Sequence, residues 1–228
     1  MSWVHSAIAT TDRRPSRILE SCKRFSRRLS TGITRAVRRI QVPDARLDSI
    51  LSKNFQHPRS LDEIVKCTRF SKSEIRLLYR SFKQDCPGGN VSEERLREIY
   101  LQLFPQGNSV KYAHYLFSVI DRNHRGTFTF DDYILTLSVL CRGTIDEKLR
   151  WIFRLYDING DGQLTRDNVT EVILSLYDLL GTAAQPRVDE REILQHVDKI
   201  FESFDPMQTE EITMEDFIDY CKRVSFMT

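Results

Sequence analysis

Residues 157–168 read DINGDGQLTRDN, and this stretch decides the fold. Its first half follows D-x-N-x-D-G, which puts oxygen-bearing side chains at alternate positions and a glycine at the sixth. Calcium is a hard cation that a twelve-residue loop can bind through positions 1, 3, 5, 7, 9 and 12, with Gly at position 6 for a sharp turn. The stretch therefore predicts a cation-binding loop. Its defect is Asn168, which stands where Glu would supply two oxygens.

Three other stretches repeat this layout, at 84–95, 121–132 and 205–216, and the four starts are 37, 36 and 48 residues apart. We number them loops one to four in chain order, so that 157–168 is loop three. The eighth position of every loop is apolar and placed for a short strand that pairs with the neighbouring repeat; these residues are Val91, Phe128, Leu164 and Ile212. A repeat of this period with a central turn is the helix–loop–helix plan of the EF-hand, four times over.

Apolar residues recur at helical spacing on both sides of the loops. Ser71-x-x-Glu74 and Thr144-x-x-Glu147 match capping boxes and predict helix starts. Two of the apolar stripes are Ile75, Leu78, Tyr79, Phe82 and Leu96, Ile99, Tyr100, Leu103. The sequence predicts an all-α fold of four EF-hand units in two lobes with short loop-pairing β-strands. We expect a basic amphipathic tail at 1–59, an N-lobe at 60–143 and a C-lobe at 144–228.

Loop three has the best donor set for a hard cation. Its candidate ligands are Asp157, Asn159, Asp161, Gln163 through its backbone carbonyl, Thr165 and Asn168. The neutral amide of Asn168 removes one oxygen and one negative charge, and both numbers set the affinity of such a loop. We expect weak calcium binding, at this one site.

Loop two is a weaker candidate, whose ligands would be Asp121, Asn123, Thr127 and Asp132. Arg125 occupies position 5, where its guanidinium competes with a metal unless the side chain turns to solvent. Asp132 is shorter than Glu and offers one oxygen, a geometry closer to what Mg²⁺ accepts. Magnesium is therefore a second candidate ion.

Loops one and four are expected to hold no metal. Arg95 puts a cation at position 12 of loop one, and Met207 at position 3 of loop four is no ligand for a hard ion. Glu210 also replaces the glycine at position 6 of loop four. The acidic residues at position 12 of loops two and four follow Thr at position 9, a pattern that equally predicts helix N-caps kept without metal.

Charge is divided unevenly along the chain. Residues 1–40 carry ten Arg or Lys against two acidic residues, a balance of +8, so the other 188 residues sum to −6. Apolar residues recur every three or four positions in the basic segment: Ile18, Cys22, Phe25, Leu29, Ile33, Val37 and Ile40. This indicates a basic amphipathic helix that binds an anionic membrane surface or fills a groove. A solvated tail is the alternative, and Cys22 is a candidate for palmitoylation.

Three stretches closely resemble the neuronal calcium sensor superfamily: LLYRSFKQDCPGG at 77–89, YAHYLFSVID at 112–121 and LSVLCRGTIDEKLRWIFRLYDINGDG at 137–162. Within it they are most similar to the potassium-channel-interacting, calsenilin-like branch. The resemblance implies a non-catalytic subunit that takes the cytoplasmic N-terminal segment of an A-type (Shal-class) voltage-gated potassium channel into an apolar groove. Projected onto this sequence, the groove residues are Phe82, Tyr100, Phe104, Phe117, Trp151 and Tyr156.

Departures from that family concern its metal sites. Relatives usually hold calcium in loops three and four, which are altered here at Asn168, Met207 and Glu210. The chain also stops soon after the last predicted helix, so we expect no further helix over the groove. We therefore expect blunted calcium dependence. A calcium switch that uses loop three is the first alternative, and a calsenilin-like DNA-binding regulator is the second.

Enzymatic motifs are missing from the sequence, which contains no Gly-rich phosphate loop and no H-E-x-x-H. Ser2 stands where myristoylation requires Gly, and the five cysteines form no C-x-x-C pair. We expect a cytoplasmic protein, peripheral at the plasma membrane, for which nucleic acid is a poor partner, because basic charge alone gives only sequence-blind attraction.

Overall fold

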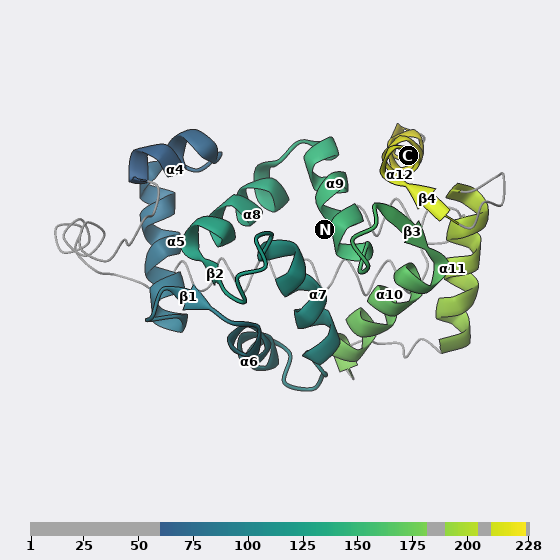
Figure 1. Ribbon diagram of the computed structural model, residues 1–228, viewed down its shortest axis with the longest axis horizontal. Helices are drawn as coiled ribbons and strands as arrows, with labels where there is room; N and C mark the ends of the chain where they lie inside the picture. Colours follow the sequence, from purple (N-terminus) through teal and green to yellow (C-terminus); the bar gives the residue numbers. More distant parts are fainter. Residues whose placement is uncertain (1–59, 182–189, 205–210, 227–228) are drawn as a thin grey trace.

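The computed structural model describes residues 60–181, 190–204 and 211–226. The predicted tail helix with Cys22 and the first six residues of loop four lie outside these ranges. Between its loops, the described chain is helical apart from four very short strands, as the sequence predicts (Figure 1). None of its helices is both long and apolar enough to span a lipid bilayer.

The N-lobe consists of two helix–loop–helix units and one preceding helix. Its elements are α4 (Leu61–Cys67), α5 (Lys72–Asp85), β1 (Asn90–Val91), α6 (Glu93–Leu103), α7 (Val110–Ile120), β2 (Phe128–Thr129) and α8 (Phe130–Arg142). Helix α4 was not foreseen in the sequence, although Ser60 and Glu63 form a capping box at its start. The predicted box of Ser71 and Glu74 begins α5. Reciprocal capping satisfies backbone N–H groups that the first turn of a helix leaves free.

The C-lobe repeats this order. Its elements are α9 (Ile145–Tyr156), β3 (Gln163–Thr165), α10 (Arg166–Leu180), α11 (Glu190–Phe204), β4 (Glu211–Thr213) and α12 (Met214–Phe226). The predicted capping box of Thr144 and Glu147 begins α9, directly after α8 has ended at Arg142. One loop and one strand thus follow α5, α7, α9 and α11 in turn.

Loop one pairs with loop two, and loop three with loop four, through their short strands. Val91 lies opposite Phe128 in the antiparallel pair β1–β2, and Leu164 lies opposite Ile212 in β3–β4. These are the four eighth-position residues, so the predicted pairing is confirmed. All four side chains are buried, with exposed fractions of 1–2%. Each pair of loops is therefore joined at its centre by apolar side chains and backbone hydrogen bonds.

The core follows the predicted stripes with one exception. Ile75, Leu78, Tyr79 and Phe82 are all buried, as are Leu96 and Tyr100 in the second stripe. Leu103, however, is 47% exposed. Helix α6 ends at this residue, and the non-helical Phe104 that follows turns into the core instead. The periodicity therefore predicted the wrong residue at the point where the helix stops.

The two lobes contact each other where α7 packs on α9 and α10, where α8 meets α9, and through the turn before α7. The backbone N–H of Asn108 donates to the carbonyl of Asp178 at 2.8 Å. A Cβ on Gly107 would lie 1.8 Å from the carbonyl oxygen of Leu179, so only glycine fits there. Between the helices, the hydroxyl of Tyr115 bonds to Glu171 and lowers the pKa of that carboxyl. The N-lobe thus holds the end of the helix that leaves loop three.

Candidate functional site

Loop three wraps around the carboxylate of Asp157. One oxygen, Oδ1, accepts the backbone N–H groups of Gly160 at 2.9 Å and Asp161 at 3.2 Å. The other, Oδ2, accepts the N–H of Gly162 at 3.0 Å. Gly160 and Gly162 have φ of 71° and 83°, which glycine adopts at little cost. The D-x-N-x-D-G sequence thus folds into a turn centred on its first aspartate.

The last ligand position of loop three belongs to a helix cap. Oδ1 of Asn168 accepts both the backbone N–H of Thr165 at 3.0 Å and its hydroxyl at 2.8 Å. The N–H of Asn168 in turn donates to the Thr165 hydroxyl at 3.2 Å. Asn168 is only 3% exposed. Two of the six predicted ligand positions are therefore engaged with each other at the start of α10.

The donor chemistry of loop three nevertheless fits a hard cation. Asp157, Asn159, Asp161 and the carbonyl of Gln163 would hold the ion, and the first and third carry a side-chain charge of −2 in total. Asp161 already accepts the N–H of Gln163 at 3.0 Å, which turns the chain at position 7. A bound calcium ion would neutralise these carboxylates and connect α9 to α10 through the loop.

Loop two has the same turn but contains a cation of its own. Asp121 accepts the N–H of Arg125 at 3.1 Å and that of Gly126 at 2.8 Å. The guanidinium of Arg125, at position 5, reaches across the loop to Oδ2 of Asp132, at position 12, over 2.6 Å. Thr129 donates its N–H and its hydroxyl to the same oxygen, each at 2.9 Å. The side chains present do not fit a divalent ion, because the guanidinium at ligand position 5 is itself bound to the carboxylate at position 12.

Loop one is also bridged by basic side chains. Arg95, at position 12, donates to the carbonyl of Asp85 and binds Glu98 at 2.7 Å. Lys83 donates to the carbonyl of Pro87 within the same loop. These carbonyl oxygens accept hydrogen bonds from cationic side chains of the protein itself, so they are not free to bind a metal ion in loop one.

Little of loop four can be described. Met207 and Glu210 lie outside the described residues. At its end the hydroxyl of Thr213 donates to Asp216 at 2.6 Å, and the N–H of Asp216 donates back at 3.3 Å. Asp216 therefore takes part in a helix cap, the alternative role that the sequence offered for it.

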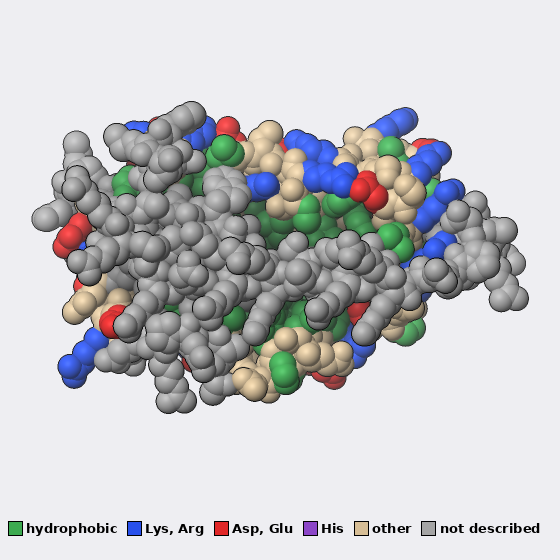
Figure 2. Space-filling model, turned by 180° about the vertical axis from the view of Figure 1, so that it is seen from behind, with side chains coloured by type: hydrophobic (Ala, Val, Ile, Leu, Met, Phe, Trp, Pro, Cys, Tyr) green, Lys and Arg blue, Asp and Glu red, His purple; other side chains and the backbone are tan. Residues whose placement is uncertain are grey.

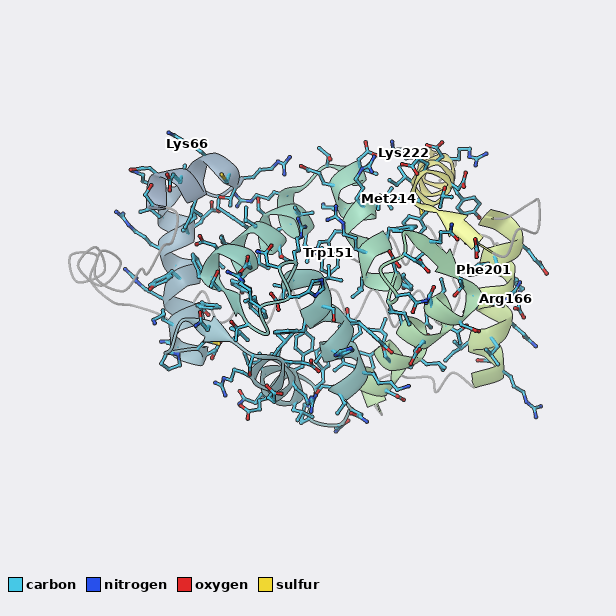
Figure 3. The ribbon with its side chains drawn as sticks, viewed as in Figure 1. Lys66, Trp151, Arg166, Phe201, Met214 and Lys222 are labelled. Carbon is cyan, nitrogen blue, oxygen red and sulfur yellow. The ribbon has the colours of Figure 1, made fainter. Side chains whose placement is uncertain are left out.

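The helices around loop three are connected to those around loop four by polar contacts. Arg166, the first residue of α10, binds Asp198 of α11 and lies 5.2 Å above the ring of Phe201. Figure 3 shows Arg166 and Phe201 together at this edge of the C-lobe. On the other side, Lys222 of α12 binds Asp146 of α9 at 2.6 Å. A shift of α9 or α10 on metal binding to loop three would therefore be transmitted to α11 and α12, the two helices of the last unit.

All six residues predicted for the partner groove are buried, with exposed fractions of 1–8%. They belong to one core cluster with the other buried apolar side chains. Trp151 lies near the centre of the molecule (Figure 3), and its indole N–H has no acceptor among the described residues. The core role that helical spacing alone predicts for each of these aromatic residues is thus what the structure shows.

Sequence reasoning missed the connections that the loop arginines make. It placed Arg125 correctly at position 5, but the ion pair with Asp132 seven residues later has no periodic signal. Within the described ranges, no group of three or more His, Cys, Asp or Glu side chains could hold a metal ion. The potential ligand set of loop three contains only two acidic side chains, Asp157 and Asp161, and is completed by an amide and a backbone carbonyl.

One known family matches part of the chain. EF-hand pairs are generally non-catalytic and regulatory, and they have the capacity to bind calcium. The structure shows an all-α EF-hand fold, and residues 146–222, from α9 to α12, match the family model of the EF-hand domain pair.

Proposed function

We propose that this protein is a non-catalytic EF-hand subunit that regulates an A-type, Shal-class potassium channel with little dependence on calcium. The observation that carries the proposal is the state of the loops. Loops one and two are crossed by arginine side chains, and loop three has the amide of Asn168 in a cap where a bidentate carboxylate would bind. The fold is an all-α EF-hand fold, whereas the ligand chemistry favours a body that keeps one shape with or without metal.

The proposed partner is an apolar helix from the cytoplasmic N-terminal segment of the channel. Support comes from the resemblance of the sequence and from the surface. Hydrophobic side chains are visible in the middle of the face shown in Figure 2, which is the reverse of that in Figure 1. Leu101, Leu103 and Val110, around the turn from α6 to α7, are 43–47% exposed. An amphipathic helix gains free energy by covering such side chains.

A binding titration of the full chain with a Shal-class N-terminal peptide tests this proposal. We expect saturable binding whose dissociation constant changes by less than about threefold between EGTA and calcium. Trp151 fluorescence, measured in a Trp3→Phe background, is the readout, since this side chain is one of the predicted groove residues. A peptide with its apolar residues replaced by serine is the control. Binding only in calcium would favour the calcium-switch alternative, and absence of binding in both conditions would contradict the channel as partner.

We further propose that the basic segment of 1–59 holds the protein at the cytoplasmic face of the plasma membrane. The balance of +8 in residues 1–40 supports attraction to anionic lipid, at about 1 kcal/mol for each basic residue near the surface. Flotation with phosphatidylserine vesicles should show binding that weakens between roughly 0.1 and 0.5 M salt, a range over which the screening length shortens about twofold. Neutral vesicles are the control. A Cys22→Ser variant expressed in cells measures any added contribution of an acyl chain.

A further inference from the structure

Loop two contains charges that would ordinarily be balanced by a metal ion. Asp121 and Asp132, at its first and last positions, are carboxylates at the two ends of one short turn. Asp121 is 3% exposed, and burial of a carboxylate without compensation is unfavourable. Something must therefore neutralise or solvate this pair when the loop is folded.

The compensation comes from inside the loop. Three carboxylate oxygens accept hydrogen bonds: the two of Asp121 from the N–H groups of Arg125 and Gly126, and Oδ2 of Asp132 from Thr129 and from the Arg125 guanidinium. The guanidinium contact is short and charge-assisted, the stronger class of hydrogen bond. With Arg125 included, the ligand positions of loop two carry a charge of −1 rather than −2.

We infer that Arg125 is a built-in cation that takes the place of a metal ion in loop two and keeps the loop folded and closed to divalent ions. The guanidinium is attached two residues from the ligand at position 3, so it competes at an effective concentration on the order of millimolar. A divalent ion would have to displace it and would still meet its charge nearby. Arg95 in loop one supports the same principle, because its guanidinium binds the carbonyl of Asp85 across that loop.

The consequence is that the two lobes differ in their response to calcium. An N-lobe with internal cations has the same loop structure at every calcium concentration. Any response to calcium then begins in the C-lobe. This inference does not depend on the proposed partner or on the affinity of loop three.

The experiment uses the full chain with loop three disabled by Asp157→Asn and Asp161→Asn, so that its calcium affinity cannot affect the outcome. On this background Arg125 is replaced by Asp, and, as a matched control, Arg122 is replaced by Asp. Arg122 is an exposed residue of the same loop, at position 2, so the two variants change the charge equally. Calorimetry with Ca²⁺ and then Mg²⁺ measures binding, and the amide signal of Gly126 in ¹⁵N NMR reports on loop two itself.

We expect the parent to show no shift of the Gly126 amide at millimolar Ca²⁺ or Mg²⁺. Arg125→Asp should bind one additional ion at least tenfold more tightly than Arg122→Asp. Arg125→Gln changes the charge by one unit instead of two and should show a smaller gain in the same direction. This variant keeps the test open if the Asp variant fails to fold.

Two outcomes would overturn the inference. A Gly126 shift in the parent would mean that the arginine does not exclude the ion. Equal binding by the Arg125 and Arg122 variants would mean that the guanidinium is not the obstacle. In that second case, a gain that appears only after Asp132→Glu would identify the short carboxylate as the reason instead.

Discussion

Loops two and three have the same backbone turn and differ in what balances its charge. In both, the carboxylate at position 1 accepts the N–H of the glycine at position 6, at 2.8 Å in loop two and 3.0 Å in loop three. Position 5 separates them: Arg125 in loop two is a cation bound to position 12, and Asp161 in loop three is an anion. The turn is therefore a property of the chain, and the side chains at positions 5 and 12 set the charge that is left for a metal ion.

The difference between the loops also matters for how the two lobes contact each other. Helix α10, which follows loop three, ends against the N-lobe turn that contains Gly107 and Asn108. The lobe with internal cations thus holds the far end of the helix that the other lobe would move. The N-lobe supports the end of α10 in this arrangement, and loop three of the C-lobe has acidic ligands that no described basic side chain crosses.

The largest expected effect comes from straining the contact between the lobes. Gly107→Ala places a methyl group against the carbonyl of Leu179 and should lower the free energy of unfolding by about 3 kcal/mol, since it combines overpacking with damage to a backbone hydrogen bond. Gly88→Ala is the control, because a Cβ there meets nothing within 4 Å, and it should change stability by less than about 0.5 kcal/mol. Urea unfolding followed by circular dichroism measures both. Equal effects would mean that the lobes do not depend on this contact.

A second change tests position 12 in both loops. Asn168→Glu adds a charge and a second oxygen to loop three and keeps a residue that suits the cap with Thr165. We expect calcium to bind roughly 10- to 100-fold more tightly, or about 1.4–2.7 kcal/mol. Asp132→Glu in loop two, with Arg125 present, should give no gain. Calorimetry on the two single variants measures this, and a gain from Asp132→Glu would remove the distinction drawn between the loops.

Much of the fold could be predicted because it depends on repeated signals. The period of the loops, the apolar eighth residue and the capping boxes each recur, and the register of Val91 with Phe128 followed from them. What could not be predicted depends on side-chain direction. Position 5 of loop two identified Arg125 as a competitor of metal, but only coordinates show that its guanidinium turns inward to Asp132 rather than to solvent.

The limits of the stripe patterns have a similar cause. Leu103 continues the periodicity of α6, yet it is exposed because the helix stops there and Phe104 takes its place in the core. The contact of Gly107 with Leu179 joins residues more than seventy positions apart, and no local pattern encodes it. Such contacts are set by how the lobes pack, whereas the sequence signals describe each unit by itself.

A third prediction concerns position 4, where loop three has Gly160 and loop two has His124. Both have positive φ, 71° and 49°. Gly160→Ala should lower the free energy of unfolding by about 1 kcal/mol, because a Cβ is strained in this region although no atom lies within 4 Å of it. The reverse change, His124→Gly, should stabilise by about 0.5 kcal/mol at most, since the added freedom of the unfolded chain offsets part of the relief. Urea titrations without metal test whether the two turns are equivalent.

The smallest expected effect concerns the sensitivity of the N-lobe to acid. The hydrogen bond from Arg142, with a further one from the backbone of Ser71, lowers the pKa of Glu74 from 4.5 to about 2. Because the folded-state pKa is the lower one, the contribution of Glu74 to stability is present above pH 4.5 and is lost as the pH falls from 4.5 to about 2. Glu74→Gln should therefore lower the urea midpoint at pH 7 and leave it close to that of the parent at pH 2. The side chain is 39% exposed, so solvent screening keeps the difference small. Arg142→Gln, which removes the partner, should reduce the pH dependence over the same interval. An undiminished dependence in both variants would place the acid-sensitive groups elsewhere in the chain.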